Sequence, residues 1–314
     1  MAEIDQKIED KPVKAWFASS GMHLAVKDIH LPCYVLENGQ RVFDKAGVQK
    51  AMHYTGKSKD WLNEFLENID RYAKLPDELL ESIAANPAFE TSSGEIRFAL
   101  QPQLLAESCR VIATAKDAGF LYLSEYKYAK AAATIYELLQ SHDAVMLIDY
   151  ASGYDAYKFN YKEALGRRLC ETTGSFSGWM KSFPDAFFDM LFELTGRSWK
   201  DTAGMQEVAD FIYNAVYLRL EPGLLGELNQ GKPRMKYGKG YALTSYNEHP
   251  DLQAYLISLR KLHKDSGGNY STFMQLIDRT YPIKRLRTNP GEAEAQPTGI
   301  GAFTDTLKKV ISRK

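Results

Sequence analysis

Near the N-terminus, the dipeptide Asn38-Gly39 separates two short runs of strand-forming residues, 32–36 and 40–43. Asn and Gly are the residues that best tolerate the positive φ angles of a two-residue type I′ turn. Apolar runs of this length on either side of such a turn predict an antiparallel hairpin. A second hairpin is predicted for residues 88–98, across Ser92-Ser93-Gly94. The chain must therefore contain at least a small antiparallel β unit.

The rest of the chain has the pattern of helices, because apolar residues recur three and four positions apart. Gly119 follows one such segment, where the C-terminal cap of a helix belongs. Helices are predicted to begin near residues 59, 76, 102, 124 and 162 and to span 185–194, 205–220, 250–263 and 270–280. The expected fold class is α+β and predominantly α-helical. A β-hairpin unit comes first, a helical middle region follows, and a helical C-terminal domain comes last.

Breaks in composition divide the chain into four expected parts. A Gly/Ser/Thr-rich joint occupies residues 172–178, and a Pro/Gly-rich linker occupies residues 288–301. Segments of this kind punctuate helical patterns and mark boundaries. The predicted parts are an N-terminal α+β unit with hairpins (1–100), a helical middle region (101–173), a helical domain (174–286), and a linker with an amphipathic C-terminal helix (287–314).

The overall charge of the chain points to no polyanionic partner, since 39 Lys and Arg balance 40 Asp and Glu among 314 residues. Any nucleic-acid contact must come from a local patch. Three widely spaced cysteines predict free thiols in a reducing cytoplasm rather than a disulfide framework. The acidic N-terminus predicts no signal peptide, and no run reaches the ~18 apolar residues of a membrane span. We therefore expect a cytoplasmic protein.

Aromatic and proline boxes recur in a fixed order along the C-terminal half, at residues 181–188, 217–225 and 273–282. Together with the hairpin at 32–42 and a central box at 148–155 followed by Lys158, they resemble the P-sixty-three-C domain of phage and mobile-element proteins. The resemblance covers most of the chain and implies the helical C-terminal domain, but it implies no settled activity. Tyr150 and Asp155 stand where the family has Glu and Gln, so no polar chemistry is assigned to these two positions.

The strongest candidate for nucleic-acid binding is the loop at 232–241. Mobile cations can contact phosphates while a tyrosine stacks on an unpaired base. The family carries histidines in this loop, and this chain has none. The candidate residues are Lys232, Arg234, Lys236, Tyr237, Lys239 and Tyr241, with a fainter patch at Lys57 and Lys59. The leading hypothesis is a non-catalytic, antirepressor-like regulator that binds nucleic acid, although such a loop can also serve only solubility.

A second hypothesis makes the chain a protein-interaction or assembly factor. The helices at 102–148 would form its interface with a protein partner or a second copy. The alanine-rich surface of residues 129–133 would let another helix approach closely, either in the same chain or in a partner. The aromatic boxes, in contrast, are expected to build a core, because large rings such as Phe187 and Trp199 supply much apolar area.

No catalytic residue, metal site or cofactor is expected from the sequence. The six histidines show no i, i+4 pair and no nearby cysteine, which argues against zinc. Phosphate-binding glycine loops and the Gly-x-Ser-x-Gly elbow are also missing. A metal-dependent nuclease built on Asp77 and Glu95 is a third, remote hypothesis, in which the acids would hold Mg²⁺. Arg97 stands where that pattern requires lysine, and Asp77 suits the first turn of a helix better.

Overall fold

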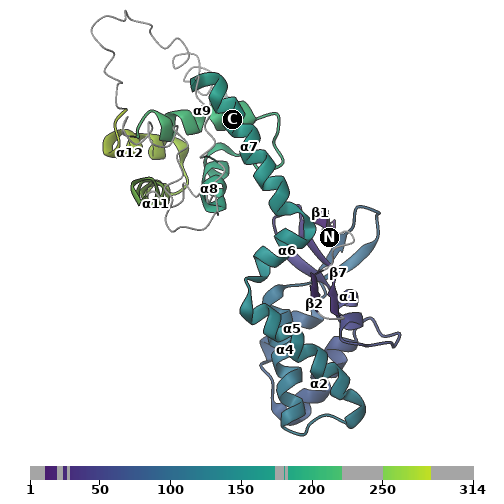
Figure 1. Ribbon diagram of the computed structural model, residues 1–314. Coiled ribbons are helices and arrows are strands. Elements are labelled where there is room, and N and C mark those ends of the chain that lie inside the picture. The colour runs from purple at the N-terminus through teal and green to yellow at the C-terminus, as the bar shows by residue number, and fades with distance from the viewer. Residues whose placement is uncertain are drawn as a thin grey trace, which may run out of the picture. The chain divides into compact units, whose positions relative to one another are not determined.

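The computed structural model describes residues 11–19, 24–26, 29–173, 180, 183–220 and 250–283. It divides into two compact units, Met1–Tyr161 and Lys162–Lys314 (Figure 1). The division falls inside helix α7 (Tyr154–Thr173). The protein is a mixed α/β protein with mostly helical elements, which confirms the expected α+β class. The four-part domain scheme stays a prediction.

The described residues of unit 1 form seven strands and several short helices. Its strands are β1 (Val13–Ala18), β2 (Leu24–Val26), β3 (Ile29–Leu31), β4 (Cys33–Leu36), β5 (Arg41–Asp44), β6 (Ala88–Glu90) and β7 (Ile96–Leu100). Its helices are α1 (Lys45–Ala51), α2 (Trp61–Ala73), α3 (Asp77–Ala84), α4 (Pro102–Asp117), the 3₁₀ turn η1 (Leu123–Glu125), α5 (Tyr126–Ser141), α6 (Ala144–Ser152) and the first turns of α7.

Both predicted hairpins are present, as β4–β5 and β6–β7. In the first, only Gly39 has a positive φ, of 84°, and the pairing of Val35 with Arg41 leaves Glu37, Asn38 and Gly39 in the loop. The loop therefore has three residues and a left-handed glycine instead of the predicted two-residue type I′ turn. The Asn38 side chain accepts a hydrogen bond from the Gln40 amide, and this contact stabilises the three-residue loop.

The hairpins combine with β1 into a closed five-stranded barrel in the order β1-β4-β5-β7-β6. Strand β1 pairs antiparallel with β4 and parallel with β6, and it closes the barrel between them. Tyr34, Leu36, Val42, Phe89 and Ala99 form its buried interior. The sequence predicted the two hairpins but neither the barrel nor β1.

The alternate residues of β4 and β5 face the other way. Cys33, Val35 and Phe43 are fully buried, on the face opposite the barrel interior, where α6 packs against both strands. Covering both faces explains why these strands read as continuous apolar runs. Arg41 lies on the same face as Phe43, which directs its side chain toward α6.

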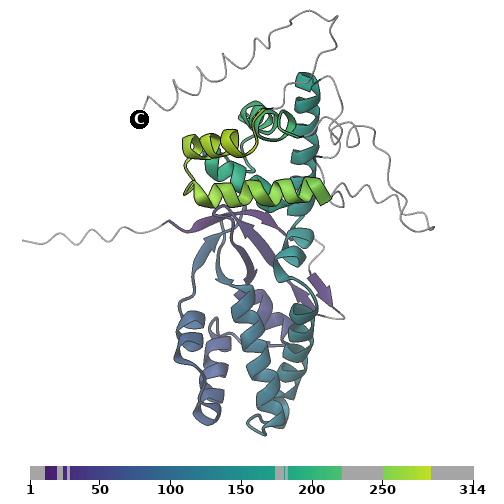
Figure 2. The same ribbon diagram turned by 90° about the vertical axis from the view of Figure 1, so that its left-hand side faces the viewer.

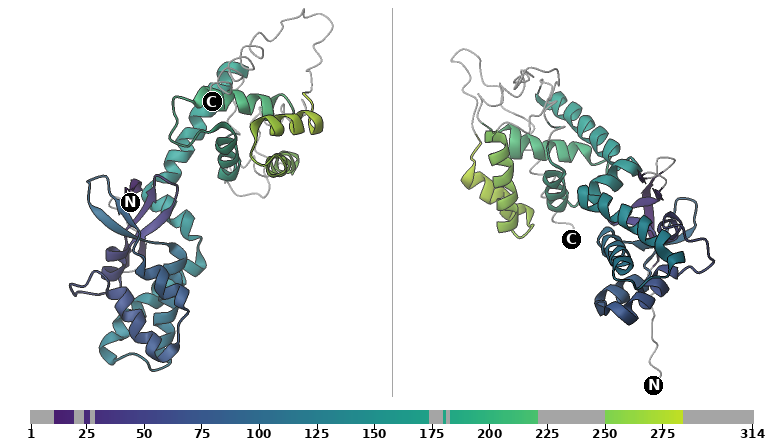
Figure 3. Two further views of the ribbon diagram at one scale, coloured as in Figure 1. Left: turned by 180° about the vertical axis from the view of Figure 1, so that it is seen from behind. Right: turned by 60° about the horizontal axis from the view of Figure 1, so that its bottom comes forward.

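Helices α2 and α4 of unit 1 extend toward the end away from the strands, whereas α1 and α6 pack against the strands (Figure 1). Helices α4 and α5 pack side by side as a hairpin, with α2 and α3 beside them (Figure 2). Ala129, Ala131 and Ala132 of α5 are buried. The small-residue surface is therefore used within the chain, which was one of the two expected alternatives. Figure 3 shows the same grouping from two further sides.

Unit 2 contains the rest of α7 with α8 (Asp185–Thr195), α9 (Met205–Ile212), the π-helical turn η3 (Tyr213–Tyr217), α11 (Pro250–Asp265) and α12 (Tyr270–Thr280). Phe183, Phe187, Phe188 and Trp199 are buried, as expected for a structural role. The Lys162 ammonium donates to the Phe183 carbonyl at 2.8 Å and to Asp185 at 2.6 Å, and it lies over the Phe188 ring. The aromatic box therefore anchors the start of α8 to α7.

A buried arginine connects η3 with α12 in unit 2. Arg219 donates to the backbone oxygens of Asn214 and Tyr281 and forms an ion pair with Asp278 at 2.7 Å. Its guanidinium thus joins η3 to the end of α12. In the part of the chain that the structure describes, no helix has the length and apolar character needed to cross a membrane.

Candidate functional site

The nucleic-acid loop predicted at 232–241 lies outside the described residues, so the placement of its six candidate side chains is not described. Lys57 and Lys59 are described and lie exposed in the connection between α1 and α2. Neither makes an ion pair with another described residue. Their surroundings also carry acids, since Asp60 follows directly and Glu64 accepts a hydrogen bond from Ser58. The two lysines alone are therefore a weak attraction for phosphate.

The acids of the nuclease hypothesis lie on separate elements. Asp77 is exposed in the first turn of α3, and Glu95, just before β7, forms an ion pair with Arg97 at 2.8 Å. Arg97 also pairs with Asp44 at 2.8 Å. Within the described ranges, no group of three or more His, Cys, Asp or Glu side chains is arranged to hold a metal ion.

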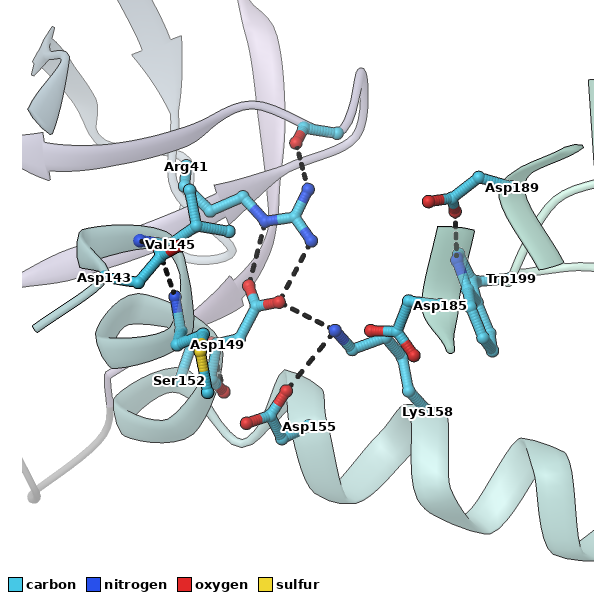
Figure 4. Close-up of polar contacts among 12 residues, drawn as sticks. Arg41, Asp143, Val145, Asp149, Ser152, Asp155, Lys158, Asp185, Asp189 and Trp199 are labelled. Atoms are coloured by element: carbon cyan, nitrogen blue, oxygen red, sulfur yellow. Dashed lines mark hydrogen bonds and ion pairs between the residues drawn. The ribbon is translucent and has the colours of Figure 1, made fainter. Parts of the chain in front are cut away.

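The Asp149 carboxylate on α6 is a buried polar group of unit 1 that is bound by side chains of two other elements (Figure 4). Its side chain is only 4% exposed. It accepts from Arg41 Nε at 2.8 Å and Nη2 at 3.0 Å, and from Lys158 Nζ at 2.7 Å. The bidentate arginine and the ammonium satisfy both oxygens, which is the arrangement a buried carboxylate requires. We call Arg41, Asp149 and Lys158 the Asp149 network.

Local structure places each member of the network. Asp143 caps α6 by accepting hydrogen bonds from the amides of Val145 and Met146, and Gly153 ends the helix with a φ of 79°. These caps fix a nine-residue helix whose sixth residue is Asp149. Helix α7 begins at the next residue, Tyr154, and its first turns place Lys158 next to the Asp149 carboxylate. Arg41 arrives from the predicted hairpin, 108 residues earlier in the sequence.

An aromatic cluster borders the network. The ring of Tyr154 lies under both cations, 5.1 Å from the Arg41 guanidinium carbon and 4.8 Å from Lys158 Nζ. Trp16 and Phe17 of β1 pack on the same ring at 5.3 and 5.2 Å. The network therefore ties β1, β5, α6 and α7 together. Because Asp155 also lies 3.3 Å from Lys158, two cations face two carboxylates, and the arrangement favours a structural role over anion binding.

A second buried polar group lies at the end of the barrel. Asp44 Oδ2 accepts from Arg97 Nη1 and from the Gly47 amide, which caps α1. Asp44 Oδ1 is buried and has no hydrogen-bond partner among the described residues. Burial raises the pKa of the Asp44 carboxyl, and the Arg97 charge opposes that rise. The neighbouring Lys45 is also buried, and its ammonium donates to Asn63, Asn86 and the Ile83 carbonyl.

The clearest exposed feature is apolar and lies at the turn between α4 and α5. Helix α4 leaves the barrel directly after β7 and runs for 16 residues, about 24 Å, so this turn is far from the strands. Three large side chains are exposed there, at 37% for Phe120, 77% for Tyr122 and 83% for Leu123, and Tyr72 of α2 is exposed at 64% beside them. The rings of Tyr72 and Phe120 stack at 5.7 Å. We call these four residues the tip surface.

A pocket of about 240 Å³ opens beside the tip surface, between the end of α2 and the second half of α4. Ile69, Val111 and Ala115 form its buried walls, and Phe120 belongs both to its lining and to the tip surface. Lys74 and Arg110 are its only charged lining residues. The sequence indicated an interface somewhere in residues 102–148, but it did not indicate this pocket, because Ile69 and Lys74 come from another helix.

One feature of the sequence could have pointed to the tip surface, namely the run of adjacent apolar residues at 120–123, directly after the helix-ending Gly119. An apolar run in a turn has no helical face to fill.

Comparisons of the chain with protein-family models, with curated proteins and with solved structures found no match.

Proposed function

We propose that this chain is a non-catalytic protein-interaction factor that binds a partner through the tip surface. The single observation that supports this proposal is the exposure of four large apolar side chains, three at the turn between α4 and α5 and one beside it on α2. Isolated exposed apolar residues are ordinary, but a contiguous group marks a surface that another molecule covers.

The tip surface rests on a fixed backbone, which suits it for binding. The Tyr122 amide donates to the Glu125 carboxylate at 2.8 Å, and the Glu125 amide donates to the Tyr122 carbonyl at 2.9 Å. Leu121, between the exposed residues, is buried and anchors the turn. A surface that is already ordered loses less conformational entropy on binding than a flexible loop does.

The proposal is tested by affinity purification of the full chain from its native cells, after nuclease treatment. We expect a stable heteromeric complex that is lost with Tyr122→Ser plus Leu123→Ser. The matched control is Tyr150→Ser, which removes a tyrosine that is 71% exposed on α6. Recovery of the same complex from the tip variant, or its loss from both variants, would contradict the proposal.

The nucleic-acid hypothesis stays a second candidate, favoured by the exposure of Lys57 and Lys59 without an ion pair among the described residues and by the cations of the 232–241 loop. The test is a gel shift of the full chain with DNA and RNA over a salt series. We expect binding that weakens steeply with salt and further when Lys232, Arg234, Lys236 and Lys239 become alanine. Absence of binding at low salt would eliminate this candidate.

We also propose that the chain is a phage or mobile-element protein of the P-sixty-three-C type that acts in the cytoplasm. The sequence boxes of the hairpin and of residues 148–155 support this assignment, because both contribute to the Asp149 network. A box shared for structural reasons would place a charged pair at these positions in other members. The test is the structure of a second chain with the same boxes, in which an equivalent ion network is expected.

A further inference from the structure

We infer that the pocket beside the tip surface receives one aromatic side chain of a protein partner, and that a carboxylate next to that side chain pairs with Lys74. This inference rests on the proposed function and names the chemistry of the segment that binds there. It goes beyond the exposed apolar patch, because it assigns a specific anchor to a specific pocket.

The size of the pocket favours a side chain over a small molecule. Its volume of about 240 Å³ lies below the ~300–1,000 Å³ of typical small-molecule sites. Interfaces commonly centre on one aromatic residue that fills such a pocket, surrounded by contacts that exclude water. Phe120 forms a wall of the pocket and stacks on Tyr72 outside it, so an anchored segment would continue directly onto the tip surface.

The charges of the lining favour an acidic segment. Both charged lining residues are cations, and the lining holds no carboxylate. Arg110 is already held by Glu107, whose Oε2 accepts from its Nε at 2.9 Å and whose Oε1 accepts from its Nη2. Lys74, in contrast, is exposed and makes no ion pair with another described residue. An acidic group on the partner would therefore form an ion pair with Lys74 rather than with Arg110.

The position of Lys74 is fixed by the end of α2. Its backbone has a φ of 52°, in the left-handed region that a residue with a side chain seldom adopts. Two hydrogen bonds hold it there, from the Lys74 amide to the Asp70 carbonyl and from the Leu75 amide to the Asp70 carboxylate at 2.7 Å. The backbone of this lining residue is thus fixed by the turn, which keeps its side chain beside the pocket.

The experiment uses the full chain and a displayed library of random 12-residue peptides as the probe. We expect the selected peptides to contain an aromatic residue with Asp or Glu within one helical turn. Their affinity should fall more than tenfold with Thr114→Phe, which places a ring in the pocket from an exposed position of α4. It should fall about fivefold with Lys74→Glu and less than twofold with Lys130→Glu, an equal charge change on the exposed side of α5.

The outcomes separate the inference from the proposed function. Peptides that lose binding with Leu123→Ser but bind Thr114→Phe normally would overturn the pocket assignment and leave the tip surface as the interface. Peptides without an acidic residue, or an equal effect of the two lysine substitutions, would overturn the role of Lys74. If none of the selected peptides depends on the pocket or the tip surface, both proposals fail. Circular dichroism of each variant confirms that the fold is retained.

Discussion

Substitution of Asp149 by Asn tests whether the Asp149 network holds unit 1 together. The change keeps the size of the side chain and removes its charge. It leaves the Lys158 ammonium, which is only 7% exposed, with a neutral amide in place of its buried partner and with the exposed Asp155 at 3.3 Å as a remaining carboxylate among the described residues. Arg41 loses two charge-assisted hydrogen bonds of 2.8 and 3.0 Å. Removing one partner of a buried ion pair leaves an uncompensated charge, and such changes cost about 3–5 kcal/mol.

The expected loss can be measured by thermal and urea unfolding of the full chain. A unit of this size loses roughly 2–4 °C of melting temperature per kcal/mol. A loss at the lower bound of ~3 kcal/mol therefore lowers the unfolding temperature of unit 1 by roughly 6–12 °C. The matched control is Asp155→Asn, because Asp155 contacts the same ammonium at 3.3 Å from an exposed position. We expect it to cost less than about 1 kcal/mol.

Two results would refute this reasoning. One is an Asp149→Asn protein whose unfolding curve matches that of the unchanged chain. The other is an equal loss of stability for Asp149→Asn and Asp155→Asn, which would mean that burial of the carboxylate does not determine its contribution.

Three further predictions concern other buried groups. Burial raises the pKa of the Asp44 carboxyl above 3.8, so the folded state binds this proton more tightly than the unfolded state does. In urea titrations, the stability of the unchanged chain relative to Asp44→Asn should therefore fall as the pH rises above that value. A stability difference that rises or stays constant with pH would contradict this. Burial raises the pKa of Cys33 to about 11 and also raises that of Cys109, so iodoacetamide at about pH 8 should modify Cys170 first in the native protein, and early labelling of Cys33 in a peptide map would contradict this. Arg219→Lys keeps the charge but loses the forked hydrogen bonds, and we expect calorimetry to show a loss of about 2–4 kcal/mol in unit 2; a loss below about 0.5 kcal/mol would show that charge alone suffices.

Local features of the fold could be predicted from the sequence, because they depend on neighbouring residues. The Asn38-Gly39 turn and the apolar face of α2 are examples, since turn chemistry and helical spacing act over a few positions. Strand β1 could not be predicted in this way. It contains only six residues, and it is a strand because it pairs with β4 and β6. Strand β6 lies far along the chain from β1, so no local pattern shows this pairing.

The candidate sites show the same limit. Arg41 and Asp149 both belong to boxes that were singled out, yet nothing local shows that residues 108 positions apart would share one ion pair. The available signal was that Asp149 follows a run of apolar residues, 144–148, in the sequence. The tip surface was contained in the predicted interface at 102–148, whereas its pocket depends on α2. The cations of the 232–241 loop lie outside the described residues and stay a prediction.

The central claim, that the tip surface binds a protein partner, is tested most directly by site-specific photocrosslinking in native cells. A photoreactive residue replaces Leu123, and the control places it at Tyr150, which is similarly exposed at 71%. We expect a discrete protein adduct at position 123 and none of the same size at position 150. The absence of an adduct at position 123, or the same adduct at both positions, would contradict it.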